Sequence, residues 1–178
     1  MRARLTGFLA LLLLVATVPA RAQTLPPPVA QDAPGLTRQG EGTMRFFGLK
    51  VYDVRLWTAA GKFSYAEPFA LELVYDMSLK GRDIAERSVK EMRGQGYSDE
   101  AKLARWGEEM AKVFPDIKSG ETLIGVSMPG KEARFYSRDK FIAAVPDPEF
   151  AKAFFDIWLS EKTSAPGVRG KLLSVSGK

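Results

Sequence analysis

The chain has 178 residues, with 26 Lys and Arg against 21 Asp and Glu, and it contains neither cysteine nor histidine. This composition excludes serine–histidine hydrolysis, thiol catalysis and tetrahedral zinc sites, so any chemistry must use carboxylates, lysine, arginine, tyrosine, hydroxyls or backbone groups. We expect no cofactor and no metal site, because no loop has the acidic spacing of an EF-hand.

The first 22 residues have the pattern of a cleaved export signal. Arg2 and Arg4 precede an apolar run over residues 8–18, and Ala20-Arg21-Ala22 supplies the small residues that a signal peptidase reads. The apolar run is short for a bilayer-spanning helix, and no other stretch approaches ~20 apolar residues. We therefore expect cleavage after Ala22, a periplasmic location and no stable membrane insertion. A retained membrane anchor is the alternative.

Cleavage would leave 156 residues, which suits one domain, with 23 Lys and Arg against 21 Asp and Glu. This balance is weak and evenly spread, so it does not favour binding to nucleic acid. Residues 23–35 contain four prolines and predict an extended leader. A single domain is expected over residues 36–178.

Residues 36–77 have the alternation of strands. Within residues 43–58 the apolar phase runs 47-49-51 and then 52-54-56, so it slips by one residue. This slip predicts a bulge or break between Gly48 and Tyr52. Residues 69–77 alternate cleanly, as in a strand that is buried on one face.

The rest of the chain alternates between helical and strand patterns. Residues 82–93 predict a helix, and a second helix begins with the N-cap residue Asp99 and ends at Phe114-Pro115. Strands are expected at residues 122–128, 133–136 and 141–145, with Pro129-Gly130 as a type II turn between the first two. Asp147-Pro148 opens a further helix, and a short last helix is expected near residues 168–173. This order predicts an α+β fold with helices on one face of a mostly antiparallel sheet.

In order and spacing, these segments resemble the chalcone isomerase-like family. The resemblance rests on Gly40-Glu41-Gly42, on residues 50–57 and 79–85, and on residues 147–166, which are similar to the bacterial exported (periplasmic) branch. It extends over residues 36–173. It implies the open-faced β-sandwich of that family, a large antiparallel sheet covered by helices with an apolar cleft between the two layers.

The resemblance carries over poorly to the catalytic residues of the plant enzymes. Those enzymes close a flavanone ring with an arginine, a threonine, a tyrosine and an asparagine, whose positions fall here on Met44, Phe47, Ile84 and Glu91. Three polar groups are thereby replaced, and the arginine is displaced by one residue to Arg45. Stabilising an oxyanion needs fixed donors, so a shared fold does not imply a shared reaction. Arg45 is the catalytic candidate if the chain is an enzyme, although we expect it is not.

The candidate ligand-binding residues are these family positions together with neighbouring polar and aromatic groups: Met44, Arg45, Phe47, Tyr52, Ile84, Ser88, Glu91 and Trp106. Arg45 is a candidate clamp for a carboxylate or phenolate, because arginine favours bidentate binding of anions. The others also have ordinary structural interpretations. Tyr52 and Trp106 suit the core, and Glu91 suits a surface ion pair with Arg87.

Three functions remain open from the sequence. The first is an exported, non-catalytic binder of a small apolar or fatty-acid-like ligand, with Arg45 holding its acidic head. The second is an isomerase or intramolecular lyase of chalcone type, with a rearranged site that uses Arg45, Tyr52 or Glu91. The third is an accessory envelope protein that acts through partner contacts, with the proline-rich leader as a docking segment. The sequence identifies neither the ligand nor a protein partner.

Overall fold

The computed structural model describes residues 24–59 and 61–174, so the predicted export signal lies outside the described residues. The elements follow one another along the chain as α1 (Pro27–Asp32), β1 (Leu36–Phe46), β2 (Leu49–Ala59), β3 (Phe69–Tyr75), α2 (Gly81–Gly94), α3 (Glu100–Val113), β4 (Thr122–Met128), β5 (Glu132–Ser137), β6 (Phe141–Val145), α4 (Pro148–Leu159) and α5 (Pro166–Leu173).

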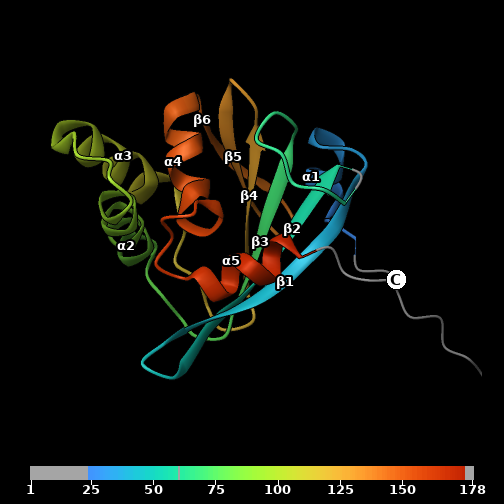
Figure 1. Cartoon of the computed structure of the whole chain (residues 1–178), viewed down its shortest axis with the longest axis horizontal. Coiled ribbons are helices and arrows are strands. Elements are labelled where there is room, and N and C mark those ends of the chain that lie inside the picture. Colours follow the sequence, from blue (N-terminus) through green and yellow to red (C-terminus); the bar gives the residue numbers. More distant parts are fainter. Residues whose placement is uncertain (1–23, 60, 175–178) are drawn as a thin grey trace, which may run out of the picture.

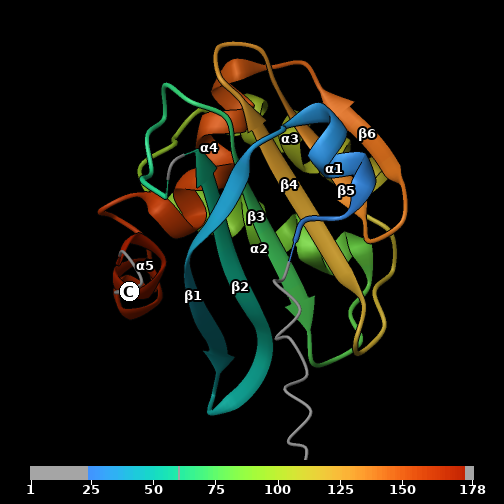
Figure 2. The same cartoon turned by 90° about the vertical axis from the view of Figure 1, so that its right-hand side faces the viewer.

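The six strands form one antiparallel sheet in the order β1-β2-β3-β4-β5-β6, so every strand pairs with its neighbour in sequence. Helices α2, α3 and α4 lie over one face of this sheet, which we call the inner face (Figure 1). Helix α1 lies on the opposite, outer face, and α5 lies beside β1 (Figure 2). The arrangement confirms the predicted α+β fold class.

Local signals in the sequence set several of the element ends. The side chain of Asp99 accepts a hydrogen bond from the backbone N–H of Lys102 at 3.0 Å and so caps α3. Asp147 caps α4 in the same way, accepting from the N–H of Phe150 at 3.0 Å. Between β4 and β5, Gly130 has a φ of 68°, the positive value that the third residue of a type II turn requires. The caps and the turn thus lie where the sequence predicted them.

The β1–β2 hairpin contains the predicted irregularity. Met44 pairs with Tyr52 and Arg45 pairs with Lys50, which leaves Val51 as an extra residue in β2. The bulge expected between Gly48 and Tyr52 is therefore confirmed. A bulge turns the residues on one side of it to the opposite face of the strand, which explains the slip in the apolar pattern.

The expectation of an extended leader is wrong for residues 27–32, which form helix α1. Leu25, Val29 and Ala33 lie on one side of this segment and are buried on the outer face of the sheet, in a small core with Trp57 and Tyr136. Proline is well tolerated in the first turn of a helix, where its missing N–H has no partner to lose. Packing against the sheet, which the local sequence does not reveal, stabilises this short helix.

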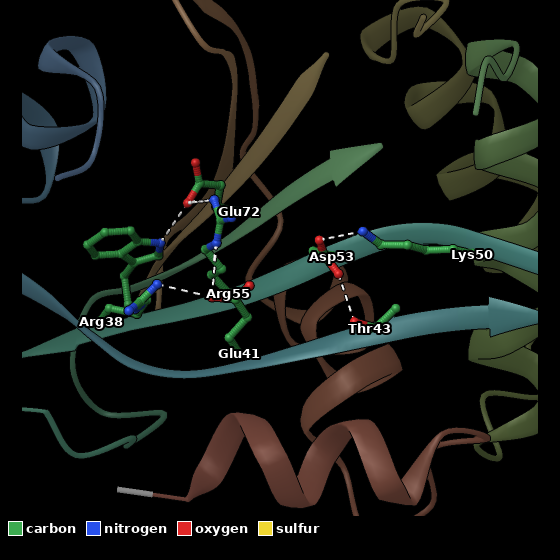
Figure 3. A network of polar contacts seen from close by, with 8 residues as sticks. Arg38, Glu41, Thr43, Lys50, Asp53, Arg55 and Glu72 are labelled. Atoms are coloured by element: carbon green, nitrogen blue, oxygen red, sulfur yellow. Dashed lines mark hydrogen bonds and ion pairs between the residues drawn. The ribbon is translucent and has the colours of Figure 1, made fainter. Parts of the chain in front are cut away.

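Beside this small core, the outer face carries a network of paired charges across β1, β2 and β3 (Figure 3). Arg55 lies between two carboxylates, 3.3 Å from Glu41 and 3.5 Å from Glu72. Asp53 accepts hydrogen bonds from Thr43 at 2.7 Å and from Lys50 at 2.8 Å. These contacts join neighbouring strands, so we assign the network to fixing their register.

Helix α5 approaches β1 so closely that the strand needs glycine there. A Cβ atom on Gly40 would lie 2.3 Å from the carbonyl oxygens of Lys171 and Leu172, and one on Gly42 would lie 3.1 Å from Val168. Next to Gly40, the side-chain amide of Gln39 donates to the carbonyl of Leu173 at 3.0 Å. The two glycines of the Gly40-Glu41-Gly42 motif therefore allow α5 to pack closely against β1, at the edge of the sheet.

Candidate ligand-binding cleft

A cleft of about 320 Å³ lies on the inner face of the sheet, between the strands of its β1 side and helices α2 and α4. Its wall is mainly apolar. The apolar residues that line it include Val51, Leu73, Met77, Leu79, Ile84, Leu123, Phe135, Phe154 and Ile157. The volume lies in the ~300–1,000 Å³ range typical of pockets for small molecules.

The local fold determines which side chains reach the cleft. In β3, Leu73 and Tyr75 are two residues apart and therefore share the inner face. In α2, Ile84, Ser88 and Glu91 recur at helical spacing along one side. The bulge at Val51 allows both Val51 and its neighbour Tyr52 to line the cleft.

Most polar groups of the cleft gather at the end formed by α2 and the β1–β2 hairpin. Glu91 pairs with Arg87 one helical turn earlier, and it also accepts a hydrogen bond from the Ser164 hydroxyl at 2.7 Å. The Ser88 hydroxyl donates to the carbonyl of Ile84 at 2.8 Å, on its own helix. Glu91 and Ser88 thus already have partners within the protein.

Arg45 stands at the same end, on the exposed side of the hairpin. Its guanidinium donates to the carbonyl of Gly48 at 3.2 Å, within its own turn. Among the described residues, no carboxylate lies within ion-pair distance of Arg45. Arg87 lies close by, 5.4 Å from the centre of the Phe46 ring. The cleft therefore has two guanidinium groups at its mouth, of which Arg87 is neutralised by Glu91 and Arg45 is not.

Tyr75, which is buried, and Tyr52, which is partly buried, supply further hydrogen-bonding groups. The Tyr52 hydroxyl accepts a hydrogen bond from the Trp158 indole at 3.0 Å, and its ring centre lies 5.4 Å from that of Tyr75. Burial raises the pKa of both tyrosines well above the ordinary value. Within the described part of the chain, the Tyr75 hydroxyl has no hydrogen-bond partner. Both groups are thus neutral donors that a ligand in the cleft can use.

The structure brings six of the eight candidate residues together and separates two. Met44, Arg45, Tyr52, Ile84, Ser88 and Glu91 line the cleft. Phe47 instead lies at the turn between β1 and β2, where its side chain is 91% exposed. Trp106 is packed in the core, and its indole N–H donates to Asp147 at 3.0 Å. Neither Phe47 nor Trp106 lines the cleft, so the structure does not support these two positions as ligand contacts.

Several residues that line the cleft were not among the candidates from the sequence, notably Tyr75, Arg87 and Ser164. Two of them had usable signals. Tyr75 follows the alternation of Leu71 and Leu73 on the inner face, and Arg87 lies near Ser88 and Glu91 on one helix. Ser164 comes from the loop between α4 and α5, 73 residues from the carboxylate that it contacts, and no local pattern marks it.

Within residues 24–59 and 61–174, no three His, Cys, Asp or Glu side chains are grouped closely enough to hold a metal ion. Over the same residues, no helix combines the length and apolar character that a membrane span requires.

Comparisons with known proteins point to one family. The family model described as "Chalcone isomerase-like" matches residues 20–174. No curated protein matches the chain. Among solved structures, a fatty-acid binding protein of Arabidopsis thaliana, AtFAP1, matches with a TM-score of 0.61 and 12% sequence identity, over 79% of this chain and 88% of that one. At this identity the match shows a shared fold.

Proposed function

The chain belongs to the chalcone isomerase-like family, and we propose that it is a non-catalytic binder of a small apolar ligand with an acidic head, such as a fatty acid. The observation that carries this proposal is the apolar cleft of about 320 Å³ with Arg45 at its mouth. An apolar wall suits a hydrocarbon chain, and a guanidinium without a carboxylate partner suits an anionic head.

The two arginines at the mouth have different roles in this proposal. Arg87 already pairs with Glu91, so a ligand carboxylate would have to compete with a carboxylate of the protein. Arg45 gives one hydrogen bond to a neutral carbonyl and keeps its charge available. The hydroxyls of Tyr52 and Tyr75 add neutral donors inside the mouth, since burial raises the pKa of both. The likeness in fold to a fatty-acid binding protein supports the same ligand class by analogy.

We further propose that the protein is exported to the periplasm after cleavage behind Ala22 and belongs to the bacterial exported branch of its family. The support for this part comes from the sequence. It consists of the basic start, the apolar run over residues 8–18 and the Ala20-Arg21-Ala22 motif. Comparing the mass of the protein in a periplasmic extract with that of the full chain tests both the cleavage site and the location.

Native mass spectrometry of residues 23–178, followed by solvent extraction, tests the ligand class directly. We expect a bound apolar acid, or binding of added dodecanoic acid. A protein that is free of ligand and that fatty acids do not stabilise would contradict the proposal. Turnover of chalcones above the rate in buffer, abolished by Arg45→Ala, would replace it with the isomerase alternative.

The role of Arg45 is tested by the difference between an acid and its neutral analogue. We expect Arg45→Ala to weaken binding of dodecanoic acid about tenfold and to leave binding of dodecanol nearly unchanged, because the lost hydrogen bonds go to a charged head. Arg82→Ala is the matched control, since Arg82 is an exposed arginine of α2 that pairs with Glu86 and does not line the cleft. Equal losses for acid and alcohol would rule out the clamp.

A further inference from the structure

The turn between β1 and β2 carries an exposed apolar cluster, which we call the hairpin tip and define as residues 46–49. Phe46 is 53% exposed, Phe47 is 91% exposed and Leu49 is 66% exposed. The tip projects beyond the rest of the sheet, on the side of α2, at the lower left of Figure 1. Large apolar side chains gathered on a projecting turn are a recognised mark of an interaction site.

The aromatic side chain at position 47 has little part in stabilising the fold, because it is almost fully exposed. Phe47 has a φ of 47° and Gly48 has a φ of 81°, the pair of positive values found in a type I′ turn. Asn-Gly is favoured in such turns, whereas a bulky residue at positive φ is strained. The Phe47 ring packs against one other ring, that of Phe46, at 4.5 Å between centres. A residue that is both strained and exposed is better explained by a contact outside the chain.

A cationic groove lies beside the tip. A second, open groove of about 520 Å³ runs between β1, α2 and the start of α5. Its lining contains three cations, Arg45, Arg87 and Lys171, and no carboxylate. Arg87 keeps its partner Glu91 on the side of the cleft, outside this groove. The groove therefore presents a cationic surface directly behind three exposed apolar side chains.

The groove and the cleft meet at the tip. Both are lined by Met44, Arg45 and Phe46 of the hairpin and by Arg87 and Ser164 from the helical layer. The mouth of the apolar cleft thus lies at the same end of the molecule as the exposed rings. An apolar ligand entering or leaving the cleft there would pass these side chains.

We propose that the hairpin tip docks on the surface of an anionic lipid membrane. Phe46, Phe47 and Leu49 enter the interface, the cations of the groove lie against lipid phosphates, and the mouth of the cleft faces the bilayer. Apolar insertion combined with cationic contacts is the usual basis of peripheral membrane binding. A lipid surface suits a narrow projecting turn whose three large apolar side chains are each more than half exposed. This docking proposal rests on the proposed function only for the identity of the ligand that passes through the mouth of the cleft.

Vesicle co-sedimentation tests the docking. We expect residues 23–178 to bind vesicles of phosphatidylcholine with phosphatidylglycerol more strongly than vesicles of phosphatidylcholine alone, and to bind less as salt is raised. Phe47→Asn should weaken binding to the vesicles roughly tenfold, because it removes a ring that enters the lipid interface. It should also raise the Tm slightly, because asparagine suits the turn. Phe141→Thr is the control, as Phe141 is 49% exposed on β6, at the other end of the strand order.

The depth to which the tip enters the bilayer is measured with a tryptophan placed at the tip. The three native tryptophans are 1–5% exposed, so brominated acyl chains should quench them little. Phe47→Trp adds one exposed tryptophan, which we expect to be quenched when the protein binds anionic vesicles. Binding that Phe47→Asn does not weaken, or fluorescence of the Phe47→Trp variant that brominated lipid leaves unchanged, would overturn the proposal.

Two further outcomes separate the explanations. Wild-type protein that binds dodecanoic acid in solution but ignores vesicles would overturn docking and leave the proposed function standing, whereas docking without fatty-acid binding would support docking alone. A dimer in solution that stays off vesicles and that Phe47→Asn converts to a monomer would assign the tip to a second copy of the chain. That result would also overturn the membrane proposal.

Discussion

Around α3 and the first turn of α4 the inner side of the sheet is filled with large side chains, whereas between α2, the later turns of α4 and the β1 side of the sheet there is a cleft of about 320 Å³. We call these the filled half and the hollow half. In the filled half, Trp106, Met110 and Phe150 are fully buried. In the hollow half, α2 turns Ile84, Ser88 and Glu91 toward the sheet, and these shorter or polar side chains leave space.

The polar groups of the two halves differ in the same way. In the filled half, Asp147 caps α4 and also accepts the indole N–H of Trp106, so both groups are satisfied by the protein. In the hollow half, Arg45 and the Tyr75 hydroxyl have unused hydrogen-bonding capacity. One continuous core can therefore serve two functions. It stabilises the fold where its packing is complete, and it binds a ligand where its packing is incomplete.

The largest expected effect comes from emptying the filled half. Phe150 has no exposed surface and packs against Trp106, with ring centres 5.9 Å apart. We expect Phe150→Ala to lower the free energy of unfolding by about 3–5 kcal/mol, because truncation removes buried surface and leaves a cavity. Urea unfolding measures this loss. A loss below about 1 kcal/mol would show that the filled half does not carry the stability assigned to it.

Filling the hollow half should instead weaken ligand binding and change the stability little. Ser88 is buried in the wall of the cleft, and its hydroxyl bonds only within its own helix. Ser88→Leu should therefore reduce fatty-acid affinity by roughly tenfold, because the ligand loses space, while the free energy of unfolding changes by less than about 1 kcal/mol. Calorimetric titration and urea unfolding measure the two quantities. Ser88→Ala, which leaves the space open, should bind as the wild type does.

The smallest effect is expected from raising the pH to about 10. Burial raises the pKa of Tyr52 and Tyr75 in the hollow half, and of Tyr65, Tyr97 and Tyr136 elsewhere. The unfolded chain releases these protons near pH ~10, before the folded chain does, so stability is retained below that pH and lost above it. Absorbance at the tyrosinate band should stay flat until the protein unfolds. A tyrosine that titrates near pH 10 while the fold persists would contradict the raised pKa of that tyrosine.

The sequence predicted those features whose causes are local. Asp99 and Asp147 mark helix starts because their side chains bond to the next few N–H groups, and the phase slip around Val51 directly records a bulge. Helix α1 escaped prediction because its stability comes from the sheet that it covers. Trp106 shows the limit for the site. Its spacing places it on an apolar helix face, but nothing local says whether that face meets the filled half or the hollow half.

The close packing of α5 against Gly40 has a consequence for the order in which the chain folds. Every strand pairs with its neighbour in sequence, so β1–β2–β3 and β4–β5–β6 can each close over short stretches of chain, whereas the β3–β4 pairing must span α2 and α3. The contact between Gly40 and the backbone of Lys171 and Leu172 instead spans most of the chain. A nascent chain that still lacks α5 can therefore form the sheet, but it cannot complete the wall beside β1 that α5 provides. Assembly of the open groove thus waits until α5 has been made.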